Sequence, residues 1–346
     1  KTFLQGWHSL GWWATGYFGI YVVLFGLIYG AAAPAVCGLV INAMFPSVPI
    51  GLGAVATAVV GFVLVWFGRY GLLEKSMTVL VGVMFVTVVG SALVILASLG
   101  SVDYTLVPSV PEGSFFRVLG VIGGVGGTIT LTCYSYWIQE KGWRSRKWIS
   151  MMRFDITTAY IITAIFAISV LIISAELLFG TGISFDGNEG LVTLADNYGE
   201  RFGTFFEWML LIGMFAAVLT SVIGPWHGVS FLFADFVSIV RTKGQGLDGS
   251  AQTPEKLPSF RIYLAWMTFP PMLLHLFEQP IVIVITYGVI GALFMPILAI
   301  GLLYLLNSRR VEREHRNGLT FNVLLSLIVA LFIYLGGTEL YQMVAG

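Results

Sequence analysis

Long apolar runs separated by short polar breaks dominate this sequence, and they restrict the chain to a helical membrane fold. A helix that crosses a bilayer needs about 20 predominantly apolar residues, and runs of that length recur along the chain. Hydrophobic residues make up 57% of the 346 residues and charged residues only 10%, whereas about a quarter of a soluble domain is charged. The composition therefore excludes water-soluble enzymes, nucleic-acid binders and disordered scaffolds, and it predicts an all-α polytopic membrane protein.

The polar breaks divide the chain into nine predicted spanning helices. An odd number places the two ends of the chain on opposite sides of the membrane. The segment 242–258 has the composition of a flexible linker, but it separates two helices of one domain, so residues 1–346 form a single transmembrane domain. The predicted spans are 12–44, 51–67, 76–99, 115–138, 154–178, 203–236, 260–277, 280–306 and 319–343.

The distribution of basic residues predicts the orientation. All of the 18 Lys and Arg residues except Arg117 and Arg201 fall at the ends of the spans on one side. Cytoplasmic loops carry an excess of Lys and Arg, so we expect a cytoplasmic N-terminus for this chain and an external C-terminus. The short loops suit a bacterial inner-membrane protein. The external loop 179–202 is acidic, which is typical of a solvated loop and, alternatively, of an entrance that gathers cations.

The fourth predicted span contains the strongest candidate for a site. Residues 123–127 include four glycines, and hydroxyl side chains follow at positions 128, 130, 132 and 135. Each glycine costs a helix interior about 1 kcal/mol relative to alanine, so this cluster predicts a broken helix whose free carbonyl groups face something polar, as in secondary transporters. Close helix packing is the alternative. The candidate metal residues are Gly126, Gly127 and Thr128, and Thr130, Thr132 and Ser135 are candidates for the pathway.

The ligands that this stretch offers are carbonyl and hydroxyl oxygens. Hard oxygen ligands suit magnesium, calcium or manganese better than copper or zinc. The sequence contains no His, Cys and Asp cluster with the spacing of metal ligands and no phosphate-binding loop. We therefore expect no resident cofactor and no enzymatic centre.

The remaining polar residues within or near the spans allow structural and functional interpretations. His227 lies in a stretch loosened by proline and glycine, where it either binds a free carbonyl group or acts as a proton-sensitive gate. Asp155 is expected to pair with Arg153 or with a helix N-terminus. Asp235 ends its span within reach of the cytoplasm, and His275 lies in an external turn at the interface.

The first two spans lack titratable side chains. No Asp, Glu, Lys, Arg or His occurs between Gly11 and Pro46 or between Gly51 and Gly68. A proton-driven pump normally carries a buried chain of such groups. The pattern therefore favours transport that is not coupled to protons.

A set of landmarks along the whole chain resembles the Nramp superfamily of divalent-metal transporters, and most closely its Nramp-related magnesium transporter branch. The resemblance implies eleven helices in an inverted five-plus-five repeat of the leucine-transporter type, with the metal site between broken helices one and six. The landmarks are residues 38–46, 68–75, 123–138, 231–235, and 295–296 with 303–307.

By the same comparison, the nine spans are similar to family helices three to eleven. Helices one and two, with their Asp and Asn ligands, would precede Lys1, so the chain is expected to be incomplete at its N-terminus. The Met-Pro-His of family helix six is replaced by Gly127, Thr128 and Ile129, and a glutamine of helix ten corresponds to Phe294. Both replacements remove groups that favour transition metals or protons, as in the magnesium branch.

The leading expectation is a secondary transporter of Mg²⁺, and also of Mn²⁺, that works by alternating access without proton coupling. Its partners are the divalent ion and the lipid bilayer, with no nucleic acid, and we expect a monomer. His227 and Phe294 join the candidate pathway. One alternative is a carrier of a small organic solute, supported by Thr130, Thr132, Tyr134 and Tyr136; another is a membrane sensor that does not transport.

Overall fold

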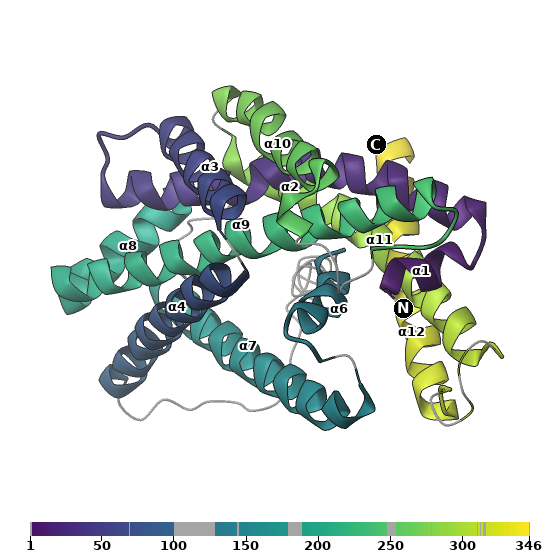
Figure 1. Ribbon diagram of the computed structural model, residues 1–346. Helices are drawn as coiled ribbons and strands as arrows, with labels where there is room; N and C mark the ends of the chain where they lie inside the picture. Colours follow the sequence, from purple (N-terminus) through teal and green to yellow (C-terminus); the bar gives the residue numbers. More distant parts are fainter. Residues whose placement is uncertain are drawn as a thin grey trace.

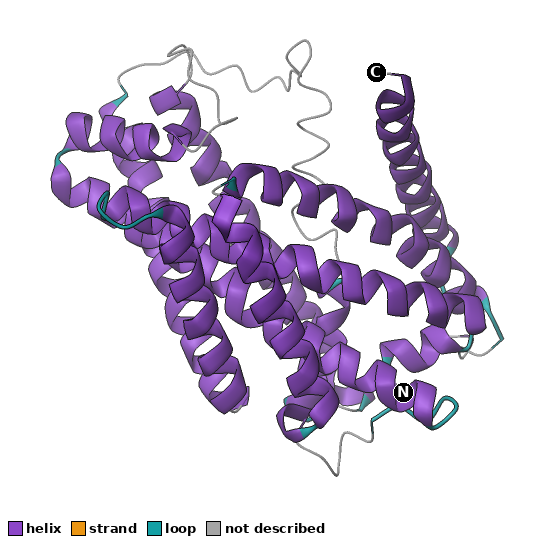
Figure 2. Cartoon of the chain, turned by 90° about the horizontal axis from the view of Figure 1, so that it is seen from above, coloured by secondary structure: helices purple, strands orange, loops and turns teal. Residues whose placement is uncertain are grey.

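All regular elements of the described structure are helical (Figure 2). The computed structural model describes residues 2–68, 70–99, 129–143, 145–178, 189–247, 254–277, 279–309, 311, 313 and 316–345. The long helices are α2 (Trp12–Met44), α3 (Ile50–Phe67), α4 (Tyr70–Ser98), α7 (Ile149–Leu178), α9 (Thr204–Arg241), α11 (Pro280–Asn307) and α12 (Leu319–Ala345). The shorter elements are α1 (Phe3–His8), α6 (Thr130–Glu140), η1 (Arg146–Trp148), α8 (Glu189–Phe202), η2 (Pro254–Lys256), α10 (Pro258–Met272) and η3 (Leu273–Phe277).

The long helices coincide with the apolar runs of the sequence. In the described ranges, five helical stretches are long and apolar enough to cross a membrane: α2, α3, α4, η1 with α7, and α9. Helix α10 has only 15 residues, and most of the predicted span 115–138 lies outside the described residues. The molecule is thus a polytopic membrane protein, while the prediction of nine spans is not established.

Helix α9 lies at the centre of the arrangement. It packs against α2, α3, α4, α6, α8 and α10, and it crosses the middle of the molecule (Figure 1). Its 38 residues exceed the length that a bilayer requires. Helix α9 also contacts α1 and η2, and the η2 contact falls on His227, in the interior of the helix.

Small residues allow the closest contacts between helices. At Gly30 of α2, an added Cβ atom would overlap the backbone carbonyl of Met267 in α10. At Gly228 of α9, it would lie 2.8 Å from Cβ and Sγ of Cys133 in α6. Such close approach is typical of helix packing in membranes, and it places α6 directly on α9.

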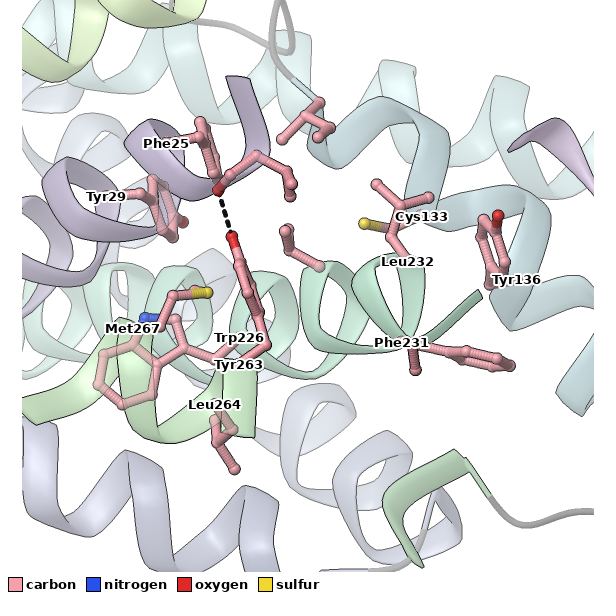
Figure 3. Close-up of a cluster of buried hydrophobic side chains, with 14 of the residues drawn as sticks. Phe25, Tyr29, Cys133, Tyr136, Trp226, Phe231, Leu232, Tyr263, Leu264 and Met267 are labelled. Carbon is pink, nitrogen blue, oxygen red and sulfur yellow. Dashed lines mark hydrogen bonds between the residues drawn. The ribbon is translucent and has the colours of Figure 1, made fainter. Parts of the chain in front are cut away.

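The main hydrophobic core joins α2, α6, α9 and α10 (Figure 3). The Tyr263 hydroxyl donates a hydrogen bond to the Val22 carbonyl oxygen at 2.7 Å, across the contact of α10 with α2. On the other side of the core, the rings of Tyr136 and Phe231 lie 5.0 Å apart. The core therefore packs α6 against α9 through the rings of Tyr136 and Phe231.

The acidic segment 179–202 differs from the predicted loop, because Glu189–Phe202 forms α8. The side chains of Leu191, Leu194 and Tyr198 are buried, and their spacing of three to four residues produces one apolar helix face. This face packs against the rest of the molecule and leaves Glu200 exposed. The prediction overlooked the amphipathic pattern because it weighed only the charges.

Candidate functional site

The three predicted metal residues, Gly126, Gly127 and Thr128, lie outside the described residues. The structure resumes at Ile129, and α6 begins at Thr130. The glycine-rich stretch therefore leads directly into α6. The described residues that follow this stretch belong to α6, which packs against neighbouring helices.

The hydroxyl residues of α6 do not all face the same way. Thr132 and Ser135 are three residues apart and share one face of the helix, whereas Thr130 lies about 200° around the axis from Thr132. The Thr132 Oγ1 donates to the Ile129 carbonyl at 2.6 Å, and the Ser135 Oγ donates to the Thr132 carbonyl at 2.7 Å. A hydroxyl that donates its proton to the backbone keeps two lone pairs, so both oxygens can accept from water or bind a cation.

Two carboxylates fix the orientation of α6. The Tyr136 hydroxyl donates to Asp235 Oδ2 at 2.7 Å, while the Leu247 backbone N–H donates to Oδ1 at 2.6 Å. Asp235 is completely buried, and through Leu247 it binds the segment that follows α9. Asp155 of α7 accepts a hydrogen bond from the Tyr134 hydroxyl at 2.9 Å, which ties α6 to α7.

His227 of α9 binds two side chains and no free carbonyl group. The indole Nε1–H of Trp137 donates to His227 Nδ1 at 3.4 Å, and His227 Nε2 lies 3.2 Å from Glu255 Oε1. Both His227 and Glu255 are at most 8% exposed. The predicted carbonyl bond is therefore wrong, because the carboxylate of η2 occupies the place where we expected backbone.

Glu255 links three further elements around His227. Its carbonyl oxygen accepts from Arg261 Nε of α10 at 3.1 Å, and Arg261 stacks on the Trp66 ring. Burial raises the pKa of Glu255, but hydrogen bonds from His227 and from the backbone N–H groups of Glu255 and Tyr70 outweigh it, so the net pKa is lowered. The carboxylate is thus favoured in its charged form.

A half-open cavity of about 590 Å³ lies beside this carboxylate. Its walls combine aromatic rings with charges of both signs. It is lined by Trp66, Phe67, Gly68, Tyr70, Gly71, Glu140, Glu255, Lys256 and Arg261. The segment predicted to be a flexible linker therefore ends in a docked element, because η2 buries Pro254 and Glu255.

Phe294 of α11 belongs to a different interface. Its side chain is completely buried, and its ring stacks on Tyr21 of α2 at 4.9 Å and on Trp7 of α1 at 6.2 Å. It fills space among rings and offers no polar atom. The structure therefore places His227 at the contact of α6 with α9, where it meets Trp137, and it places Phe294 in an aromatic contact of α11 with α1 and α2. The printed hydrogen bonds of Thr132 and Ser135 stay within α6.

The sequence interpretation missed three polar features. They are the Tyr136–Asp235 bond, the docking of Glu255, and the hydroxyl of Tyr21, which is buried without a hydrogen-bond partner. The side chain of His275 in η3 is also buried. In the parts of the chain that the structure describes, no group of three or more His, Cys, Asp or Glu residues could hold a metal ion.

Comparison with known proteins gives one family. The family model described as natural resistance-associated macrophage protein-like, or Nramp, matches residues 8–342. No curated protein matches the chain. The match covers nearly all of the described helices, from α2 to α12.

Proposed function

Because the chain belongs to the Nramp family, which implies divalent metal ion transport, we propose that it is a transporter of Mg²⁺ that also accepts Mn²⁺. The observation that carries the proposal is the glycine-rich stretch at 123–127, followed by the hydroxyl residues of α6. These groups are hard oxygen ligands, which bind magnesium and manganese.

In this proposal, the Gly126 and Gly127 carbonyl oxygens and the Thr128 hydroxyl contact the ion. Magnesium gives up its water reluctantly, so part of the contact runs through bound water. Thr132 and Ser135 support this arrangement because their lone pairs remain available on α6. Phe294, buried among aromatic rings away from α6, has no part in the pathway in this proposal.

Transport in this proposal proceeds by alternating access without proton coupling. The support is the composition of α2 and α3, whose sequences contain no Asp, Glu, Lys, Arg or His. Coupled pumps relay protons through such groups within the membrane. We propose that the monomer lies in a bacterial inner membrane, with the side that carries η2 and the end of α6 facing the cytoplasm, because that side carries most of the basic residues.

Substitution of Gly127 by methionine tests the assigned site. In the full-length protein reconstituted in liposomes, G127M should raise Mn²⁺ or Cd²⁺ uptake relative to Mg²⁺ by about tenfold, because a thioether is a soft ligand worth about one decade in affinity. The matched control is G82M in α4, where an added Cβ atom meets nothing within 4 Å. Unchanged selectivity in G127M, or an equal change in G82M, would count against this pocket.

A further inference from the structure

The hydrogen bond between Trp137 and His227 defines which tautomer the neutral histidine adopts. An indole N–H can only donate, so His227 Nδ1 accepts the bond that spans 3.4 Å between α6 and α9. The proton of the neutral ring then sits on Nε2 and points to Glu255 Oε1 at 3.2 Å. The contacts therefore form a directed chain from Trp137 through His227 to Glu255.

The charged and titratable groups around His227 come from several elements. Glu255 of η2 binds it directly, and the Tyr70 ring of α4 lies 6.2 Å away. Arg261 of α10 holds the Glu255 carbonyl oxygen. Glu140 of α6 and Lys256 of η2 line the adjoining cavity with Tyr70 and Arg261. Among these groups, only Glu255 is in hydrogen-bond contact with the ring.

A second proton on His227 would convert Nδ1 from an acceptor into a donor. Two N–H groups would then face each other, and the Trp137 bond would be lost while the ion pair with Glu255 became stronger. Trp137 has little room to turn aside on α9, because a Cβ atom added at Gly228 would lie 2.9 Å from Trp137 Cζ2. The conflict must therefore be relieved by movement of α6 or its indole away from His227.

We propose that His227 is a proton-binding site that controls the attachment of α6 to α9. The neutral ring accepts the hydrogen bond from Trp137 and keeps α6 attached to α9. The protonated ring keeps its contact with Glu255 but loses the Trp137 bond, which releases α6. Since α6 continues directly from the proposed ion site at 126–128, proton binding changes the rate of metal transport without proton movement across the membrane. The effect on transport, though not the switch itself, depends on the proposed function.

Hydrogen exchange of residues 129–140 measures the switch without any need for transport. With the full-length protein in liposomes at equal pH on both sides, exchange is followed from about pH 8 to about pH 5, the range in which histidine titrates, and corrected for the intrinsic pH dependence. Loss of one hydrogen bond should lower the protection of α6 about three- to tenfold at the acidic end. The initial rate of Mg²⁺ uptake should change at the same pH.

The W137F variant removes the donor and keeps the ring. It should show low protection at every pH and no step in either measurement. The matched control W266F loses the indole bond of α10 to the Val23 carbonyl oxygen, and it should keep the step. E255Q should reduce the step, because the protonated ring would no longer gain an ion pair with the side chain at position 255.

The outcomes separate the two claims. Protection of α6 that does not change with pH in the unmodified protein, or a step that persists in W137F, would overturn the switch. A step in hydrogen exchange without any metal uptake would keep the switch and overturn the proposed function. If the rate of Mg²⁺ uptake does not change with pH while the hydrogen-exchange protection of α6 does, the link from the switch to transport would be overturned.

Discussion

The contact of α2 with α11 and the contact of α6 with α9 are both buried, but different chemistry holds them. The first consists of aromatic rings spaced along α2, in which Phe25 stacks on Tyr29 at 5.0 Å and Tyr29 meets Tyr287 of α11 at 5.0 Å. The second consists of hydrogen bonds that end on Asp235 and His227. One contact depends on shape, whereas the other depends on the positions of protons.

This difference assigns the two contacts different roles. Ring stacking and apolar burial do not change with protonation, so α2 and α11 form a fixed part of the molecule. Hydrogen bonds are directional, and a buried polar network is costly when one member loses its partner. In the proposed switch, the network that contains His227 has a second arrangement, and α6 is the element that moves.

The largest effect is expected at the aromatic contact. Phe294→Ala should lower the free energy of unfolding by about 3–5 kcal/mol, because it leaves a cavity among the rings of Tyr21 and Trp7. Unfolding in detergent, followed by circular dichroism, measures this loss. The volume-conserving variant Phe294→Met should cost less than about 1.5 kcal/mol. If the two variants cost the same, ring packing does not hold α11 in place.

A smaller loss is expected at the polar contact. Asp235→Asn should cost about 2 kcal/mol, because a neutral amide accepts more weakly from the Tyr136 hydroxyl and the Leu247 N–H. Tyr136→Phe should cost a similar amount. The double variant should cost clearly less than the sum of the two single variants, since both remove the same bond. Strict additivity in the detergent unfolding measurement would show that the two residues do not act together.

Tyr21→Phe is expected to stabilise the protein by about 1 kcal/mol, since it removes a buried hydroxyl that has no partner. The matched variant Tyr29→Phe should instead destabilise by about 1 kcal/mol, because the Tyr29 hydroxyl donates to the Ser221 carbonyl oxygen at 2.5 Å. Thermal unfolding of the two variants provides the comparison. Destabilisation by Tyr21→Phe would mean that the hydroxyl has a partner, and that the aromatic contact is less apolar than described.

The smallest effect is expected from acid. The pKa of Glu255 is lowered from 4.5 in the folded protein, so its contribution to stability is complete above the unfolded value and is lost as the pH falls through the folded value. Stability measured below about pH 4.5 should therefore fall less steeply in E255Q than in the unmodified protein. Identical slopes would show that Glu255 is not stabilised in its charged form.

The sequence predicts the positions of the long helices well, because a helix that crosses a bilayer requires an apolar run of about 20 residues. It predicts the polar contacts poorly, because they join residues far apart along the chain. Tyr136 and Asp235 are separated by 99 positions, and Glu255 belongs to a segment whose composition resembles a linker. The periodicity of apolar residues within a helix does not predict hydrogen bonds between residues so far apart along the chain. The pathway residues Thr132 and Ser135, like the metal residues Gly126, Gly127 and Thr128, stay predictions.

Simultaneous measurement of Mg²⁺ and proton flux tests the central claim most directly. The full-length protein is reconstituted in liposomes that contain fluorescent reporters for both ions, and external Mg²⁺ is raised at a fixed, equal pH. The account predicts Mg²⁺ influx that saturates with concentration and is accompanied by no proton influx. Absence of Mg²⁺ influx at every pH, or a fixed number of protons entering with each ion, would contradict it.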